Sequence, residues 1–343
     1  MMVVHDRRLD HLRALAALWV FGFHYWHFVA HPLFAPLDSW NLFEILVYHG
    51  YFGVSLFIVL SGYLFSKLYL VRCRFDWVVF WFKRLLRIVP PLLPVFAGWV
   101  WVAGKPWEEF WRWLLNPLNL NATSYPSELG HLWSINRELQ CYAVFPLLWW
   151  LHRCYGVPGL IVAWVITMLA SLGYGLWTNS LLDFYHSFWL RLSEFCTGVL
   201  MGRLSATLMK GFRLTSMLIL FLGILAFHHW NHWRAPLNYS VSGVLDFLLL
   251  GCLLAVLIMA YERTRWHLPW LDAGLAGVGK ISYSFYLIHF PLLLSAHSYI
   301  DTLSGSLMGQ GWILLAMTLV LATLFYWLVE RPALKLKRVV NES

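Results

Sequence analysis

The chain has 343 residues, of which 60% are hydrophobic, 18% aromatic and 12% charged. Soluble domains are roughly 45–50% apolar and about 25% charged, so this composition excludes a water-soluble globule and a disordered chain. The formal net charge is +8, from 25 Lys and Arg against 17 Asp and Glu. The composition predicts an integral membrane protein, in which a basic excess does not by itself indicate nucleic-acid binding.

About ten apolar stretches are long enough to cross a hydrocarbon core roughly 30 Å thick as helices. They cover residues 12–31, 46–66, 86–104, 132–151, 157–177, 186–203, 214–230, 241–260, 282–300 and 311–329. The stretches lack the alternating polarity of barrel strands, which are about ten residues long. We therefore expect an all-α, polytopic membrane helix bundle that forms a single domain over 1–343, with a cytoplasmic tail from about 335.

The basic residues predict the orientation of this bundle. If the N-terminus is cytoplasmic, the Lys and Arg outside the spans fall on inner segments, except for Lys105, Arg112 and Arg234. Because inner loops of membrane proteins are rich in Lys and Arg, we expect both termini in the cytoplasm and no nucleic-acid partner.

Two polar residues share one face of the first span. Arg13 lies near its inner end, and His24 follows eleven residues later, about 16 Å along a helix and at nearly the same angle. A buried histidine of this kind is either a hydrogen-bonded member of the bundle or a functional group. A metal site with His27 and His31 is the weaker interpretation, because no acidic or Cys partner has matching spacing, and we expect no metal.

Arg84 and Arg87 share a face where the third span begins. Paired guanidinium groups suit phosphate, because each offers a fork of donors. Arginines at an inner helix end also satisfy topology and bind anionic lipid, which is the competing interpretation.

Several charges lie inside other spans, where each one needs an explanation because a buried charge is costly. Glu138 lies about 7–8 Å inside the outer boundary of the fourth span, and the adjacent Arg137 points elsewhere. Arg191 and Glu194 are three residues apart, which predicts an ion pair that clasps the bundle. His289 precedes a proline in the ninth span. The His and Trp residues of 228–233 predict an aromatic belt at the outer interface.

Seven segments in chain order resemble the membrane acyltransferase-3 family. They are Arg13-x10-His24, Gly53-Val-Ser-Leu-Phe-Ile-Val-Leu-Ser61-Gly62-Tyr, Arg84-x-x-Arg87-Ile-Val-Pro90, His131-Leu-Trp133-Ser-x-x-x-Glu138-x-Gln140-x-Tyr142, Arg191-Leu-x-Glu194-Phe-x-x-Gly198, Ser282-Tyr-x-x-Tyr286-Leu-x-His289-x-Pro291 and Glu330-Arg331-Pro332. Together they extend over nearly the whole chain. Two positions depart from the family pattern: Arg137 replaces an aliphatic residue and Cys141 an aromatic one, so we expect unusual acceptor recognition near Glu138.

The resemblance implies an integral membrane O-acyltransferase. Such an enzyme moves an acyl group, most often acetyl, from cytoplasmic acyl-CoA to a hydroxyl of a cell-surface saccharide or glycolipid precursor. It implies acetyl-CoA as the co-substrate, membrane lipid as the surroundings, and the bacterial inner membrane as the location. A small secondary metabolite such as a macrolide is the alternative acceptor. Residues implied to bind substrate or support the site are Ser61, Trp133, Gln140, Tyr142, Arg191, Glu194 and His289.

The positions of these residues along the predicted spans suggest their roles. We expect Arg13, Arg84 and Arg87 to hold the CoA phosphates and His24 to act as the general base on the acceptor hydroxyl, because an imidazole suits proton transfer near neutral pH. Glu138 is expected to orient His24 or to bind the acceptor. The sequence leaves open direct transfer or an acyl-enzyme on His24 or Ser61.

The alternatives to an acyltransferase are a transporter or flippase of a saccharide-linked lipid and an inactive scaffold that keeps the fold. Many spans, buried charges and a proline-broken helix are typical of transporters. The sequence has no recognisable inverted repeat, and its histidine and arginine pairs are intact, which favours the enzyme.

Overall fold

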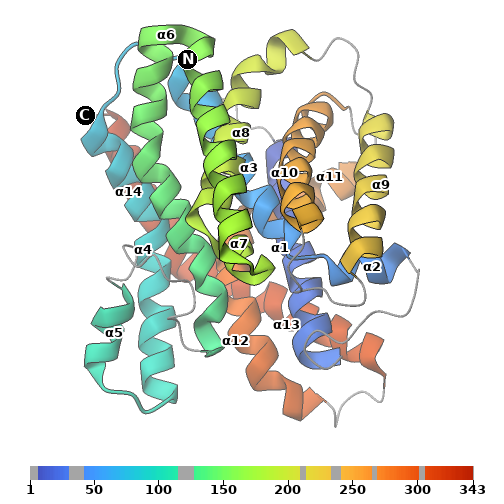
Figure 1. The fold of residues 1–343 in the computed structure, drawn as a ribbon. Coiled ribbons are helices and arrows are strands. Elements are labelled where there is room, and N and C mark those ends of the chain that lie inside the picture. The colour runs from blue at the N-terminus through green and yellow to red at the C-terminus, as the bar shows by residue number, and fades with distance from the viewer. Residues whose placement is uncertain are drawn as a thin grey trace.

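The computed structural model describes residues 7–30, 42–114, 127–208, 214–232, 241–264, 269–300 and 306–342. Every regular element within these ranges is a helix, which confirms the predicted all-α class. The helices are α1 (Arg7–Tyr25), α2 (Leu42–Tyr48), α3 (Phe52–Phe65), α4 (Trp77–Val102), α5 (Trp107–Leu114), α6 (Trp133–Thr178), α7 (Leu181–His186), α8 (Phe188–Leu208), α9 (Leu214–His232), α10 (Val241–Glu262), α11 (Pro269–Lys280), α12 (Ser282–Ile300), α13 (Leu307–Phe325) and α14 (Arg331–Glu342) (Figure 1).

The bundle is that of an integral membrane protein. Among the described residues, five helical stretches are long and apolar enough to cross a membrane: Phe52–Leu70, Trp77–Val102, Leu129–Thr178, Val241–Glu262 and Leu307–Leu336. The crossing number of ten and the cytoplasmic position of both termini remain predictions. The tail expected from about residue 335 is part of α14 and is helical as far as Glu342.

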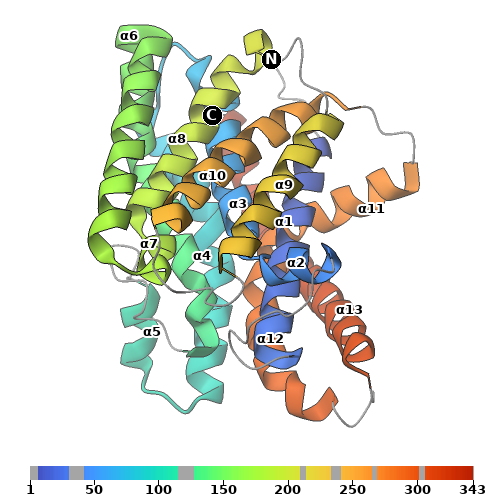
Figure 2. The ribbon, with the colours of Figure 1, turned by 45° about the vertical axis from the view of Figure 1, so that its right-hand side comes forward.

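Two helices differ from the sequence prediction in informative ways. α6 changes direction at Gly156, whose φ of 66° and ψ of −147° are not helical, so its two arms run side by side (Figures 1 and 2). The arms carry the predicted stretches 132–151 and 157–177. α4 begins at Trp77, well before the predicted 86, because the Asp76 carboxylate caps it by accepting a hydrogen bond from the Val79 amide at 2.9 Å.

α3 and α8 cross at very close range in the centre of the bundle. A Cβ added to Gly62 of α3 would lie 2.1 Å from the Phe195 carbonyl oxygen, and one added to Gly198 of α8 would lie 2.0 Å from the Val59 oxygen. Only glycine permits this approach, and small residues are the usual means by which membrane helices pack tightly. The crossing fixes the side chains that α3 presents to the interior.

We expect Gly198→Ala to lower the thermal midpoint of the purified protein in detergent, because the added methyl group must push the two helices apart. Overpacking of this kind costs about 1–3 kcal/mol or more. Gly173→Ala is the matched control, since no heavy atom lies within 4 Å of its Cβ position. Midpoints can be read from the loss of the monodisperse peak after heating, and equal midpoints for the two variants would contradict the tight crossing.

Candidate active site

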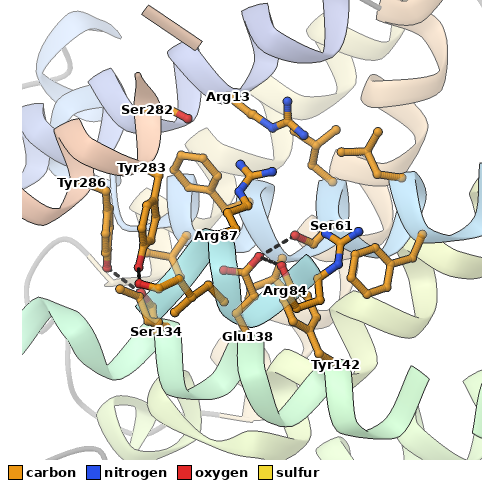
Figure 3. A pocket seen from close by; sticks show the side chains of 18 of the residues that line it. Arg13, Ser61, Arg84, Arg87, Ser134, Glu138, Tyr142, Ser282, Tyr283 and Tyr286 are labelled. Carbon is orange, nitrogen blue, oxygen red and sulfur yellow. Dashed lines mark hydrogen bonds between the residues drawn. The ribbon is translucent and has the colours of Figure 1, made fainter. Parts of the chain in front are cut away.

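The first of two adjoining cavities, called here the arginine cavity, has a volume of about 160 Å³. Its polar lining comes from five helices, α1, α3, α4, α6 and α12 (Figure 3). The residues that define it are Arg13 of α1, Ser61 of α3, Arg84 and Arg87 of α4, and Glu138 and Tyr142 of α6. The structure therefore brings together six of the residues singled out from the sequence.

Glu138 lies in this cavity with two hydrogen-bond donors. Its Oε1 accepts from Ser61 Oγ at 2.7 Å and from the Tyr142 hydroxyl (Figure 3). These partners come from α3 and α6, and His24 lines the other cavity. The structure therefore gives no support to Glu138 as the group that orients His24, and its binding of the acceptor stays a prediction. Arg137 does point elsewhere, as predicted: its Nε donates to the His186 carbonyl at 2.8 Å.

The three arginines of the cavity differ in their surroundings. Arg13 forms an ion pair with Asp10 at 2.6 Å. Arg84 is buried, with its guanidinium 4.3 Å from the centre of the Phe65 ring, and it donates to the Tyr69 hydroxyl at 3.0 Å. Arg87 lines the cavity and has no ion-pair partner among the described residues. Arg84 and Arg87 thus leave positive charge in the cavity in excess of Glu138.

The second cavity, called here the histidine cavity, has a volume of about 340 Å³ and a largely aromatic lining. His24 of α1 lines it and hydrogen-bonds His289 of α12, with 2.8 Å between His24 Nδ1 and His289 Nε2. The predicted site residue Trp133 and the buried His27 also line this cavity.

The hydrogen bonds of His289 determine which nitrogen of His24 carries the proton. His289 Nδ1 lies 2.7 Å from the Tyr286 carbonyl, which can only accept, so the neutral His289 ring is protonated there. Its Nε2 is then an acceptor, and His24 must donate from Nδ1. His24 Nε2 is left with a free lone pair, the arrangement that a general base requires.

His131 is a residue of the site that the sequence reasoning quoted in a motif but gave no role. It lines the histidine cavity, is only 3% exposed, and neither ring nitrogen has a hydrogen-bond partner among the described residues. Its ring centre lies 5.3 Å from that of His289. The sequence feature that could have pointed to His131 is its position at the start of a predicted span, three residues before Ser134.

The two cavities share a wall. Val54 of α3 and Tyr286 of α12 line both of them. The arginines line one side of this boundary and His24 lines the other. No sequence pattern indicated this division, because it depends on how α3, α6 and α12 meet.

Arg191 and Glu194 form the predicted ion pair, with 2.6 Å between Arg191 Nη1 and Glu194 Oε2, and both side chains are buried. Arg191 also donates to Ser55 Oγ at 2.8 Å and, from Nη2, to the Tyr185 carbonyl at 2.7 Å. Neither member of the pair lines the two cavities. The pair connects α8 to α3 and to α7, whose Tyr185 also lines the histidine cavity.

Gln140 and the two departures from the family pattern lie behind the cavities. Gln140 Oε1 accepts from Arg137 at 2.9 Å, and neither these residues nor Cys141 line either cavity. The expectation of unusual acceptor recognition near Glu138 stays a prediction. Arg137 connects α6 to the carbonyl of His186.

The predicted aromatic belt at 228–233 is wrong for its first two histidines. His228 and His229 are buried rather than interfacial. His228 Nδ1 lies 3.2 Å from Asp246 Oδ2 and its Nε2 lies 2.9 Å from the Tyr51 hydroxyl, and Tyr51 lines the histidine cavity. Trp230 is exposed, and Trp233 lies outside the described residues.

The weaker metal interpretation gains no support from the described part of the chain. No group of three His, Cys, Asp or Glu side chains there is arranged to hold a metal ion, and His31 lies outside the described residues.

Comparison with known proteins identifies the family. A family model described as an acyltransferase domain, acyltransferase family 3, matches residues 6–329. The chain belongs to the acyltransferase-3 family. This membership makes it an acyltransferase.

The chain is similar to three curated relatives. The chain is 25% identical over 313 residues to "Putative membrane-bound transacylase BcsY" of Komagataeibacter xylinus, covering 83% of this chain and 76% of the relative. It is 24% identical over 334 residues to a "Putative O-acetyltransferase" of Staphylococcus aureus strain COL, covering 84% of this chain and 54% of the relative. It is 23% identical over 353 residues to O-acetyltransferase OatA of Staphylococcus aureus, covering 89% of this chain and 58% of the relative.

The acyltransferase chain thus spans little more than half the length of the staphylococcal relatives. No solved structure matches it.

We expect Arg191→Met to lower the thermal midpoint strongly, because it leaves the Glu194 carboxylate buried without its cation. Removing one partner of a buried pair costs about 3–5 kcal/mol. Arg112→Met is the control, because the Arg112–Glu109 pair has the same spacing but its arginine side chain is 69% exposed, and exposed pairs contribute about 0–1 kcal/mol. Thermal unfolding in detergent measures both, and equal losses would show that burial of the Arg191 pair has no special role.

Proposed function

We propose that this chain is an integral membrane O-acyltransferase of the bacterial inner membrane that uses acyl-CoA, most often acetyl-CoA, as donor. The proposed acceptor is a hydroxyl of a cell-surface saccharide or glycolipid precursor. The observation that carries the proposal is that a cavity rich in arginine adjoins a cavity in which the His24–His289 hydrogen bond leaves His24 Nε2 available as a base. The names of the relatives, O-acetyltransferase and membrane-bound transacylase, support it.

The arginine cavity is the proposed donor site. Acyl-CoA carries phosphates, and a guanidinium group binds phosphate through two parallel donors. Arg84 and Arg87 are the better candidates for these contacts, because Arg13 is already paired with Asp10. Glu138 keeps the Ser61 and Tyr142 hydroxyls oriented toward it at one side of the cavity.

The histidine cavity is the proposed acceptor site. There His24 Nε2 takes the proton of the acceptor hydroxyl while the hydroxyl oxygen bonds to the thioester carbonyl carbon. The carbon–sulfur bond breaks, an ester forms, and the proton passes from His24 to the CoA thiolate. His289 holds His24 in the required tautomer. The aromatic lining offers flat apolar faces for the ring of a sugar.

We expect His24→Ala to abolish acetyl transfer without loss of protein. His289→Phe should lower the rate by about 10²–10⁴-fold, the usual contribution of a positioned acid–base group, because it removes the acceptor for the His24 proton. His289→Gln should restore part of the rate, since its amide oxygen can accept that proton. The assay is incorporation of labelled acetyl from acetyl-CoA into membranes of a host lacking the gene and supplied with each variant.

His152→Ala is the matched histidine control, because His152 lies away from both cavities, beside Arg203 at 3.1 Å. It should retain full activity. Substantial transfer by His24→Ala would remove His24 from its proposed role. Mass spectrometry of surface glycans from cells with and without the gene would identify the acceptor.

We expect Arg87→Gln to raise the KM for acetyl-CoA by about tenfold or more, since a hydrogen bond to a charged group contributes about 1.5–3 kcal/mol. The KM for S-acetyl-pantetheine, which lacks the nucleotide phosphates, should stay unchanged. Lys83→Gln is the control: this neighbouring cation lines neither cavity. An equal rise in KM for both donors would show that Arg87 does not bind phosphate.

A further inference from the structure

Two buried side chains lie at the boundary between the two cavities. The inference drawn from this boundary rests on the proposed function, in which an acyl group held in the arginine cavity must cross the boundary to meet His24. Val54 and Tyr286 form the wall, and they are only 6% and 7% exposed. Both side chains are therefore buried at the boundary where the two cavities meet.

Hydrogen bonds on either side hold Tyr286 in place. Its hydroxyl donates to the His131 carbonyl at 2.7 Å and accepts from Ser134 Oγ at 2.6 Å. Ser134 lines the arginine cavity and His131 lines the histidine cavity. Figure 3 shows Tyr286 and Ser134 together at one side of the arginine cavity, away from Glu138 and Tyr142. The Tyr286 ring is thus fixed at the boundary between the two cavities.

The position of Val54 is equally constrained. Val is branched at Cβ, so its side chain has little rotational freedom in a helix. The next residue, Ser55, accepts a hydrogen bond from the buried Arg191 at 2.8 Å, and α3 is held against α8 by the close glycine crossing. Neither side of the wall can retreat far without breaking buried polar contacts.

We infer that Val54 and Tyr286 form an acyl-size filter that admits a two-carbon acyl group and rejects longer ones. Val54→Ala removes two carbon atoms from the wall. Butyryl-CoA exceeds acetyl-CoA by two carbon atoms, so the space vacated by the substitution matches the added length of the acyl chain. In a close-fitting apolar site one methylene changes the rate by roughly 10–200-fold.

The test compares acetyl-CoA with butyryl-CoA as donors in membranes of the host that lacks the gene and carries each variant. Release of CoA thiol and acyl incorporation are both measured. We expect Val54→Ala to raise the butyryl-to-acetyl rate ratio by about tenfold or more. Val59→Ala is the matched control, because Val59 is a fully buried valine of the same helix that lines neither cavity. Its ratio should equal that of the wild type.

An unchanged ratio in Val54→Ala, or the same rise in Val59→Ala, would overturn the filter while leaving the acyltransferase intact. If Val54→Ala does not fold, Val54→Ile decides: its additional carbon should lower the propionyl-to-acetyl ratio, and a ratio that does not fall would overturn the filter. A wild-type protein that consumes no acyl-CoA would instead overturn the proposed function itself.

Discussion

Polar groups buried among apolar helices must find their partners within the protein, since neither lipid nor a dry core supplies them. The Arg191 guanidinium meets this constraint by bonding Glu194, Ser55 and the Tyr185 carbonyl. These contacts join α8, α3 and α7 at one point. Tyr185 in turn donates to the Tyr51 carbonyl at 2.9 Å, so the walls of the histidine cavity are connected to the same network.

Helix α3 is the structural link between the two cavities. Its glycine face permits the close approach to α8, while Ser61 bonds Glu138 in the arginine cavity. Val54, on the same helix, contributes to both cavities. A helix fixed so tightly by backbone contact can hold side chains at defined positions, which a site for two substrates needs.

The two cavities carry two different parts of the proposed reaction. A phosphate-binding group must remain cationic, and a general base must remain unprotonated. Arg84 and Arg87 line one cavity and His24 lines the other, so the proposed phosphate contacts and the proposed proton transfer lie on opposite sides of Val54 and Tyr286. The proposed function therefore follows from the arrangement of the side chains as much as from their identity.

The sequence alone determined the helical class, the membrane environment, the family resemblance and the Arg191–Glu194 pair. These features follow from composition or from spacing within one helix, which the helical repeat fixes locally. Only the tertiary structure decided that Glu138 belongs with the arginines, that His289 orients His24, and that His228 is buried against Asp246. Such contacts join helices distant in the chain, and their geometry is set by how the helices cross, for which a single sequence carries no local pattern.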